Sequence, residues 1–155
     1  AEMLLSAFSH QTEMRCNVIR PGPTIGPPTA GASDNSDKRF GQFIAAARRN
    51  EDIEVRKGDG RQFVAATDLA KVYAALLKSP VNRNTYLAVA RDFITWEEIA
   101  DLFVKALDSN SKVVVQSGSP AEPSLFHPSK IQEEFGLAFE CRRAVEEHIR
   151  LLALA

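Results

Sequence analysis

Apolar residues in this chain recur at two spacings that alternate along the sequence. One helix face is outlined by four residues at i, i+3, i+4, i+7 spacing, namely Phe40, Phe43, Ile44 and Ala47. Short apolar runs between such stretches predict strands. Helices are expected at 2–9, 40–47, 69–77, 96–107, 129–135 and 142–154, and strands at 15–19, 53–55, 63–66, 85–90 and 113–115. The alternation predicts an α/β protein.

Two helix starts carry signals of their own. Thr95 followed by Glu98 forms a capping box, in which the hydroxyl and the carboxylate satisfy free N–H groups of the first turn. Either Thr67 or Asp68 can cap the helix at 69–77, and Pro80 ends that helix. We expect Asp68 to act as a cap rather than to touch a ligand.

The longest irregular segment is 20–37, which is rich in Pro and Gly. A loop of this length inside a compact domain is usually functional or disordered. It follows the strand expected at 15–19, and in α/β proteins the loop after a strand commonly lines a ligand crevice. We therefore expect its first residues to border a binding site.

Composition and charge exclude several classes of function. The net charge of −1 and the small size of the basic groups predict no binding to nucleic acid or to anionic membranes. No apolar run approaches the ~20 residues that span a bilayer, so a cytoplasmic protein is expected. Cys16 and Cys141 form no Cys-x-x-Cys pair, which predicts free, buried thiols. No metal is expected, because His10, His127 and His148 lack the spacing of ligands.

Catalytic motifs that stand on their own are absent from the 155 residues. There is no Gly-x-Gly-x-x-Gly, no Gly-x-Ser-x-Gly and no His-Glu-x-x-His. Adjacent carboxylates fit polar helix faces or helix starts, and their spacing nominates no acid–base pair. These pairs are Glu51-Asp52, Glu97-Glu98, Glu133-Glu134 and Glu146-Glu147.

A series of short motifs nevertheless has a recognisable order. The series comprises Arg20-Pro21 with Gly26-Pro27, Gly58-Asp59-Gly60-Arg61-Gln62-Phe63-Val64, Asp68-Leu69-Ala70, Asn84-Thr85-Tyr86-Leu87, Ile94 to Ala100, Ser129-Lys130-Ile131 and Phe135-Gly136-Leu137. In this order the chain resembles, over nearly its whole length, the C-terminal half of the extended short-chain dehydrogenase/reductases. These are the NAD-dependent epimerase/dehydratase group.

The resemblance implies a Rossmann-like fold that is incomplete relative to the family. Residues 1–28 would be the last part of the Rossmann region with its Pro/Gly loop, and 38–155 would be a small mixed α/β substrate-binding lobe with closing helices. Family members carry a Tyr-x-x-x-Lys catalytic pair on a helix, and residues 1–5 look like those just after that Lys. The catalytic pair and the Gly-rich nucleotide motif are thus expected outside this chain.

The resemblance also implies site residues. Pro21, Gly22 and Pro23 would lie beside the nicotinamide of NAD or NADP, because Gly allows close approach and Pro fixes it. Thr24 and Arg61 would bind substrate, and a guanidinium suits phosphate oxygens because its planar fork meets them bidentately.

Each of these roles has an alternative that rests on the residues alone. The segment from Pro21 to Pro23 can be a rigid turn that ends a strand, and Arg61 can be a surface residue near Asp59. Sugar-nucleotide enzymes of the family commonly have Asn where Pro23 stands, and Pro23 offers no side-chain hydrogen bond. A smaller carbonyl or alcohol substrate therefore fits as well as a nucleotide sugar.

Two hypotheses for function follow. In the first, the chain is the substrate-binding portion of an NAD(P)-dependent epimerase, dehydratase or reductase, and by itself it is inactive and binds no cofactor. Its partner would be an N-terminal half or a homologous subunit, and the strand at 15–19 would present an unpaired edge. In the alternative, the chain is a non-catalytic binding or protein-interaction module derived from that fold.

Overall fold

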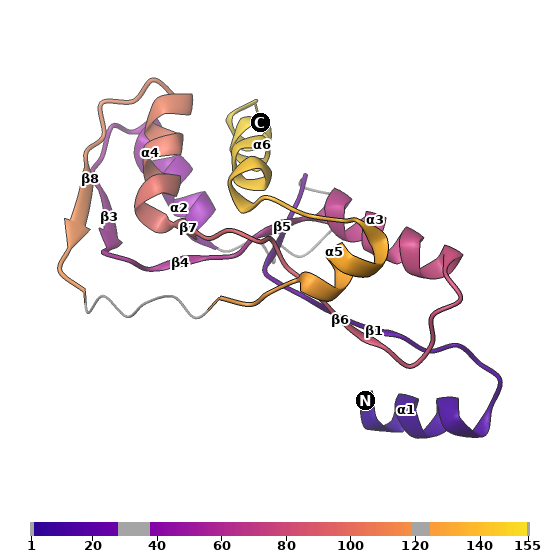
Figure 1. Ribbon diagram of the computed structural model, residues 1–155. Coiled ribbons are helices and arrows are strands. Elements are labelled where there is room, and N and C mark those ends of the chain that lie inside the picture. Colours follow the sequence, from indigo (N-terminus) through magenta and orange to yellow (C-terminus); the bar gives the residue numbers. More distant parts are fainter. Residues whose placement is uncertain (1, 28–37, 119–124, 155) are drawn as a thin grey trace.

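The computed structural model describes residues 2–27, 38–118 and 125–154 (Figure 1). Most of the loop expected at 20–37, and part of the polar link at 117–128, lie outside the described residues. The helices in the described ranges are α1 (Glu2–Gln11), α2 (Lys38–Arg48), α3 (Ala66–Lys78), α4 (Trp96–Ala106), α5 (Ser129–Phe135) and α6 (Cys141–Leu154). The strands there are β1 (Val18–Pro21), β2 (Thr24–Ile25), β3 (Ile53–Arg56), β4 (Gly60–Arg61), β5 (Val64–Ala65), β6 (Thr85–Ala88), β7 (Ile94–Thr95) and β8 (Val113–Gln116).

The strands associate in pairs that join distant parts of the chain. Parallel pairs form between β1 and β6, between β2 and β5, and between β3 and β8, whereas β4 and β7 are antiparallel. The predicted α/β class is confirmed. Several predicted strand ends are wrong, because β1 begins at Val18, β6 ends at Ala88, and the helix α3 starts directly after β5 at Ala66.

An aromatic cluster fills the core between α2 and α4. The ring of Phe40 meets three other buried rings edge-on, with centroids 5.4 Å from Phe63, 5.8 Å from Trp96 and 6.0 Å from Phe103. Edge-to-face pairs contribute about 0.5–1.5 kcal/mol each beyond the burial of their surface. The cluster fixes the start of α4 against the residue that precedes β5. The Trp96 amide at that helix start also donates to the Asp59 carbonyl at 2.9 Å, which attaches the turn from β3 to β4.

The two predicted helix caps have different outcomes. Thr95 and Glu98 form the capping box: the Glu98 amide donates to Thr95 Oγ1 at 3.1 Å, and the Thr95 amide donates to Glu98 Oε2 at 2.9 Å. The cap expected at Thr67 or Asp68 is wrong, because α3 starts before both and Ala65 precedes its first residue.

Asp68 instead links α3 to α6. Its carboxylate is 1% exposed and accepts from Arg143 on α6 and from Lys71, both at 2.7 Å. A buried carboxylate is tolerated when it is paired and hydrogen-bonded, and here two cations meet that need. Helix spacing gives no sign of Arg143, which lies 75 residues away.

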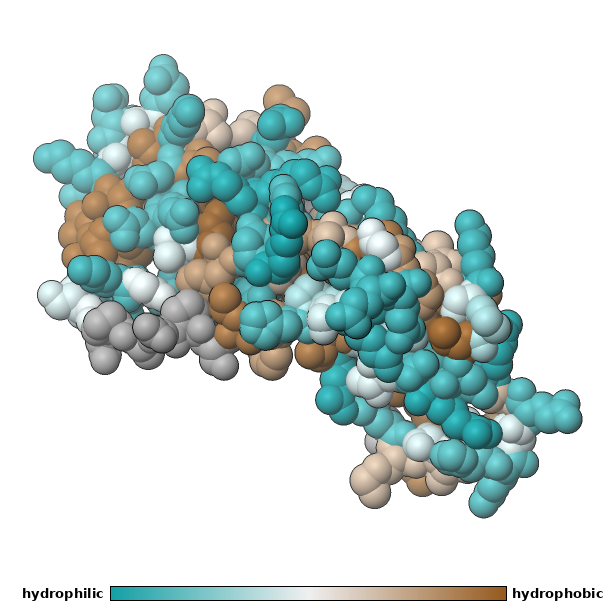
Figure 2. Space-filling model, in the orientation of Figure 1, coloured by the Kyte–Doolittle hydropathy of each residue, from teal (hydrophilic) through white to brown (hydrophobic). Residues whose placement is uncertain are grey.

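Helix α1 lies apart from the rest of the described chain (Figure 1). Helical spacing puts Leu4, Leu5 and Phe8 on one side of this helix, yet all three are exposed, at 77%, 48% and 51%, and Met3 is 86% exposed. Apolar residues are visible there among hydrophilic ones at the lower right of Figure 2. The helix is tied to the body by polar contacts, which include the ion pair of Glu2 with Arg20 at 2.6 Å.

In the described ranges, helices long and apolar enough to cross a bilayer do not occur.

Candidate functional site

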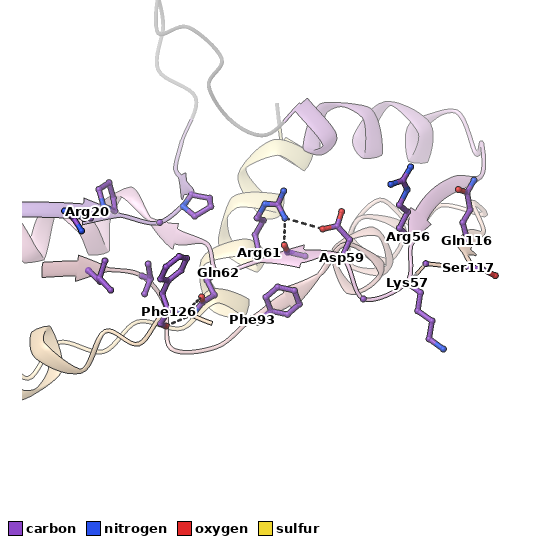
Figure 3. A pocket seen from close by; sticks show the side chains of 18 residues that line it. Arg20, Arg56, Lys57, Asp59, Arg61, Gln62, Phe93, Gln116, Ser117 and Phe126 are labelled. Atoms are coloured by element: carbon purple, nitrogen blue, oxygen red, sulfur yellow. Dashed lines mark hydrogen bonds and ion pairs between the residues drawn. The ribbon is translucent and has the colours of Figure 1, made fainter. Parts of the chain in front are cut away.

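A cavity of about 1260 Å³ opens where four segments meet. These segments are the end of β1 with the residues after it, the turn from β3 into β4, the stretch from β6 toward β7, and the end of β8. Phe126 adds a further wall (Figure 3). Parallel strands that end side by side commonly frame ligand sites in this way. The space is sufficient for a ligand of drug or nucleotide size.

Four of the five site residues predicted from the sequence lie around this cavity. Pro21, Gly22 and Pro23 form one wall, and Arg61 lies on β4, about 40 residues later in the chain. Thr24 lies beyond the lining residues, where its hydroxyl donates to the carbonyl of Gly22 at 3.1 Å. The binding roles of all five residues remain predictions.

Gly22 is required by the packing of the protein itself. A Cβ atom there would lie 3.0 Å from the Gln62 carbonyl oxygen and 3.0 Å from a methyl of Val89. Contacts that short force a neighbour to move. Glycine therefore lets the end of β1 approach both neighbours, and the Pro residues on either side hold it there.

The charged groups of the cavity are arranged around Asp59. Arg61 donates to Asp59 at 3.3 Å and to the Gly60 carbonyl at 2.7 Å, and Arg39 donates to the other Asp59 oxygen at 3.0 Å. The contact expected of a surface arginine near Asp59 is thus present. It leaves Arg61 at the cavity wall, where the guanidinium still has other N–H groups to offer.

The cavity is positively charged although the chain is not. Its lining has four cations, Arg20, Arg56, Lys57 and Arg61, and one carboxylate, Asp59, whereas the chain has a net charge of −1. A local excess of one sign raises the concentration of oppositely charged ligands at a cleft. The arrangement therefore favours an anion.

Gln62 is a structural site residue that the sequence did not reveal. Its buried side-chain amide donates to the carbonyls of Ala90 and Phe126, each at 3.0 Å, and accepts from the Phe126 amide at 2.8 Å. Figure 3 shows this link at the wall that carries Phe126. Phe93 and Phe126 were missed as well, because no local pattern indicates that such distant residues share one cavity with Arg61.

The buried, ionisable side chains of Tyr86 and Cys141 lie outside the cavity lining. Burial raises the pKa of the Tyr86 hydroxyl to about 12, with a further contribution from Glu134, to which the hydroxyl donates at 2.6 Å. Burial likewise raises the pKa of the Cys141 thiol to about 12. Both groups stay protonated at neutral pH and are unsuited to general-base chemistry there.

Metal-binding potential is low in the described part of the chain. His, Cys, Asp and Glu residues there form no group of three or more that could hold an ion. The expected absence of a metal remains a prediction.

Comparisons with known proteins give matches by structure but none by sequence. No family model matches the chain, and no curated protein sequence does. Solved structures do match it. UDP-glucose 4-epimerase from Thermotoga maritima, solved with UDP-glucose, has a TM-score of 0.72 and 16% identity, and the match covers 99% of this chain and 49% of that one. The chain has the fold of the C-terminal part of such enzymes.

Two further matches were solved with nicotinamide cofactors. RMD from Pseudomonas aeruginosa, complexed with NADPH, has a TM-score of 0.72 and 21% identity over 97% of this chain and 53% of that one. A dTDP-glucose 4,6-dehydratase from Bacillus anthracis, in complex with NAD, has a TM-score of 0.70 and 13% identity over 97% and 48%. The chain spans about half the length of the solved structures it matches. The resemblance found in the sequence is confirmed at the level of the fold.

Proposed function

We propose that this chain forms the substrate-binding portion of an NAD(P)-dependent epimerase, dehydratase or reductase. The observation that carries the proposal is the cavity, which unites the Pro21–Pro23 segment with Arg61. The sequence predicts both as site residues, and they come from different parts of the chain. The matched enzymes support the same reading, because they act on nucleotide sugars or were solved with NAD(P).

The residues of this chain and a bound cofactor would have different roles in the reaction. A bound NAD(P) would supply or accept the hydride at a substrate carbon. In this chain, Pro21, Gly22 and Pro23 offer a rigid wall against which a nicotinamide can lie, while Arg61 would hold an anionic substrate group. The 155 residues contain no Gly-rich dinucleotide motif, so we propose that they supply only part of a cofactor site. The boundary between a Rossmann part at 1–28 and a substrate lobe at 38–155 belongs to the same proposal.

Calorimetric titration tests this function. Two phosphate monoesters, phenyl phosphate and glucose 1-phosphate, serve as probes, and we expect at least one of them to bind. Arg61→Ala should weaken that binding by about tenfold or more, since a hydrogen bond to a charged group contributes roughly 1.5–3 kcal/mol. Lys78→Ala, which removes an exposed cation at the end of α3, should leave it unchanged.

The nicotinamide cofactors provide a second measurement. We expect NADH and NADPH to bind this chain with a Kd no tighter than about 1 mM. Micromolar binding of either cofactor would contradict the proposed division of labour. Failure of both phosphate esters to bind, or equal binding by the Arg61→Ala variant, would contradict a substrate site at this cavity.

The alternative function, a non-catalytic interaction module, is favoured by one observation. Helix α1 presents Met3, Leu4 and Phe8 to solvent. Exposed apolar groups of this kind often mark protein–protein contacts. The oligomeric state of the chain and of variants in α1 tests that surface.

A further inference from the structure

The cavity has two chemically different ends. Figure 3 shows Arg56 together with Gln116 and Ser117 at one end, and Gln62 with Phe126 toward the other. Arg61 and Phe93 lie between them. The apolar side chains of the lining are Leu87, Val89, Phe93 and Phe126. A ligand that fills such a space must itself be polar at one end and apolar at the other.

The polar end is suited to an oxyanion. Among the described residues Arg56 forms no ion pair, and Figure 3 shows its side chain extending to the same side as that of Arg61. The acids close by are already satisfied: Asp59 accepts from two arginines, and Glu54 accepts from Gln116 at 2.7 Å. In Figure 3 the Asp59 carboxylate, which is bonded to Arg61, lies between the Arg61 and Arg56 side chains. A phosphate at this end would use the guanidinium N–H groups that Asp59 leaves free.

The other end offers little to a sugar. Among the described residues, the polar side chains near the Pro21–Pro23 wall are engaged elsewhere. Arg20 donates to both Glu2 oxygens, at 3.1 and 2.6 Å, and the Gln62 amide is bonded to Ala90 and Phe126. A hexose bound there would leave hydroxyls without partners, at a cost of roughly 1–3 kcal/mol for each buried group.

An apolar ring meets better partners at the same place. The Phe126 ring is 59% exposed, so it can contact a ligand without any change in the core. Its backbone is fixed by Gln62, which keeps the ring at the cavity wall. Aromatic side chains gain about 0.5–1.5 kcal/mol from stacking beyond the burial of area.

We propose that the cavity binds an amphipathic anion, a hydroxy or carbonyl compound with an apolar ring and an oxyanion at the far end, in preference to a sugar. The ring lies along Val89, Phe93 and Phe126, and the oxyanion lies beside Asp59, where it accepts from N–H groups of Arg56 and Arg61 that the Asp59 carboxylate leaves free. This inference rests on the proposed function, because it places the ring beside the wall where the nicotinamide would lie. It narrows the substrate class of that function to apolar alcohols or ketones that carry an anionic group.

Three small probes test the inference with the whole chain. Phenyl phosphate and glucose 1-phosphate share the phosphate and differ in the ring, whereas benzyl alcohol has the ring without the phosphate. We expect phenyl phosphate to bind at least about tenfold more tightly than either of the others, since each partial ligand lacks one of the two contacts.

Two variants test which end of the cavity binds the ring and which end binds the phosphate. Phe126→Ala should weaken phenyl phosphate about fivefold to tenfold and leave glucose 1-phosphate within about twofold. Arg56→Ala should weaken both esters about tenfold. The matched controls are Phe8→Ala, which removes a similarly exposed ring on α1, and Lys78→Ala; neither should change binding. Thermal melts of each variant serve to check that the fold is retained.

The outcomes separate this inference from the proposed function. If glucose 1-phosphate binds as tightly as phenyl phosphate, or if Phe126→Ala weakens both esters equally, the inference is overturned. Dependence of that binding on Arg61 would still support the proposed function. If neither ester binds, both proposals are overturned.

Discussion

Cys141 illustrates how one residue's surroundings decide between opposing effects. It is the first residue of α6, and a helix N-terminus ordinarily lowers the pKa of a thiol. Here burial is the larger effect and raises the pKa of Cys141 to about 12, with Asp92 and Glu98 adding to the rise. The Phe63 amide donates to the sulfur at 3.1 Å, which opposes the shift without reversing it. The thiol therefore serves packing rather than reaction.

Thiol labelling checks this conclusion. At pH 8 we expect Ellman's reagent to modify Cys16, which is half-buried, and to leave Cys141 intact until the chain unfolds. Above the ordinary thiol pKa of 9 the unfolded chain loses this proton first, so the free energy of unfolding should fall as pH rises from 9 toward 12. Cys141→Ala, with Cys16→Ala as its control, should remove that part of the fall. Rapid labelling of both thiols in the native chain would contradict the assignment.

At the scale of elements, the antiparallel pair of β4 and β7 frames the cavity. A Cβ on Gly60 would lie 2.2 Å from the Ile94 carbonyl oxygen and 2.6 Å from the Phe93 ring. The two strands can pair this closely only because residue 60 has no side chain. Their pairing sets the positions of Arg61 on one strand and of Phe93 beside the other.

Two glycine substitutions should change stability in opposite directions. Gly60→Ala should lower the free energy of unfolding by about 2 kcal/mol or more, because backbone atoms of β7 have to move. Gly41→Ala lies in α2, where an added Cβ meets no atom within 4 Å, and should raise it by about 0.5–1 kcal/mol. Urea denaturation of the two variants gives both values. A Gly60→Ala variant as stable as the original chain would show that β4 and β7 are not packed this tightly.

Local sequence patterns predicted helices and strands better than the long-range contacts between them. The capping box at Thr95 and the stripe beginning at Phe40 were identified correctly, because caps and helix faces depend on residues within one or two turns. The role of Asp68 was predicted wrongly, because its partner Arg143 is 75 residues distant. The hydrogen bonds between Gln62 and Phe126 were not predicted for the same reason, since 64 residues separate the two. Arg61 was selected only through its place in the family's motifs, whereas Pro21, Gly22 and Pro23 were also expected at a site because their loop follows a strand.

At the scale of the whole molecule, the described fold leaves apolar and hydrogen-bonding surface open. Strand β1 pairs with β6, and in the described ranges it has no second neighbour. Parallel sheets are normally covered on both faces and extended by further strands. Helix α1, which precedes β1 in the chain, has three exposed apolar residues, Met3, Leu4 and Phe8. Such surface favours association with another chain or with further polypeptide.

We expect the chain to self-associate as its concentration rises. Light scattering coupled to size exclusion should show a larger mass at about 100 μM than at about 1 μM, if apolar contacts of α1 provide a few kcal/mol. The double substitution Met3→Glu and Leu4→Glu should shift the chain toward monomer. Leu154→Glu, at an equally exposed leucine of α6, is the control and should not. A chain that is monomeric throughout, or a control that acts as strongly as the α1 variant, would contradict a role for α1.

The position of Trp96 gives the cavity an optical reporter of its own. It is the single tryptophan of the chain, and the guanidinium carbon of Arg39 lies 3.7 Å from its ring centroid. The same Arg39 donates to Asp59, which shares its carboxylate with Arg61 at the cavity wall. An occupant that attracts Arg61 would change the charge balance on Asp59 and hence over the indole. Intrinsic fluorescence can therefore register filling of the cavity without a dye, a label or a coupled reaction.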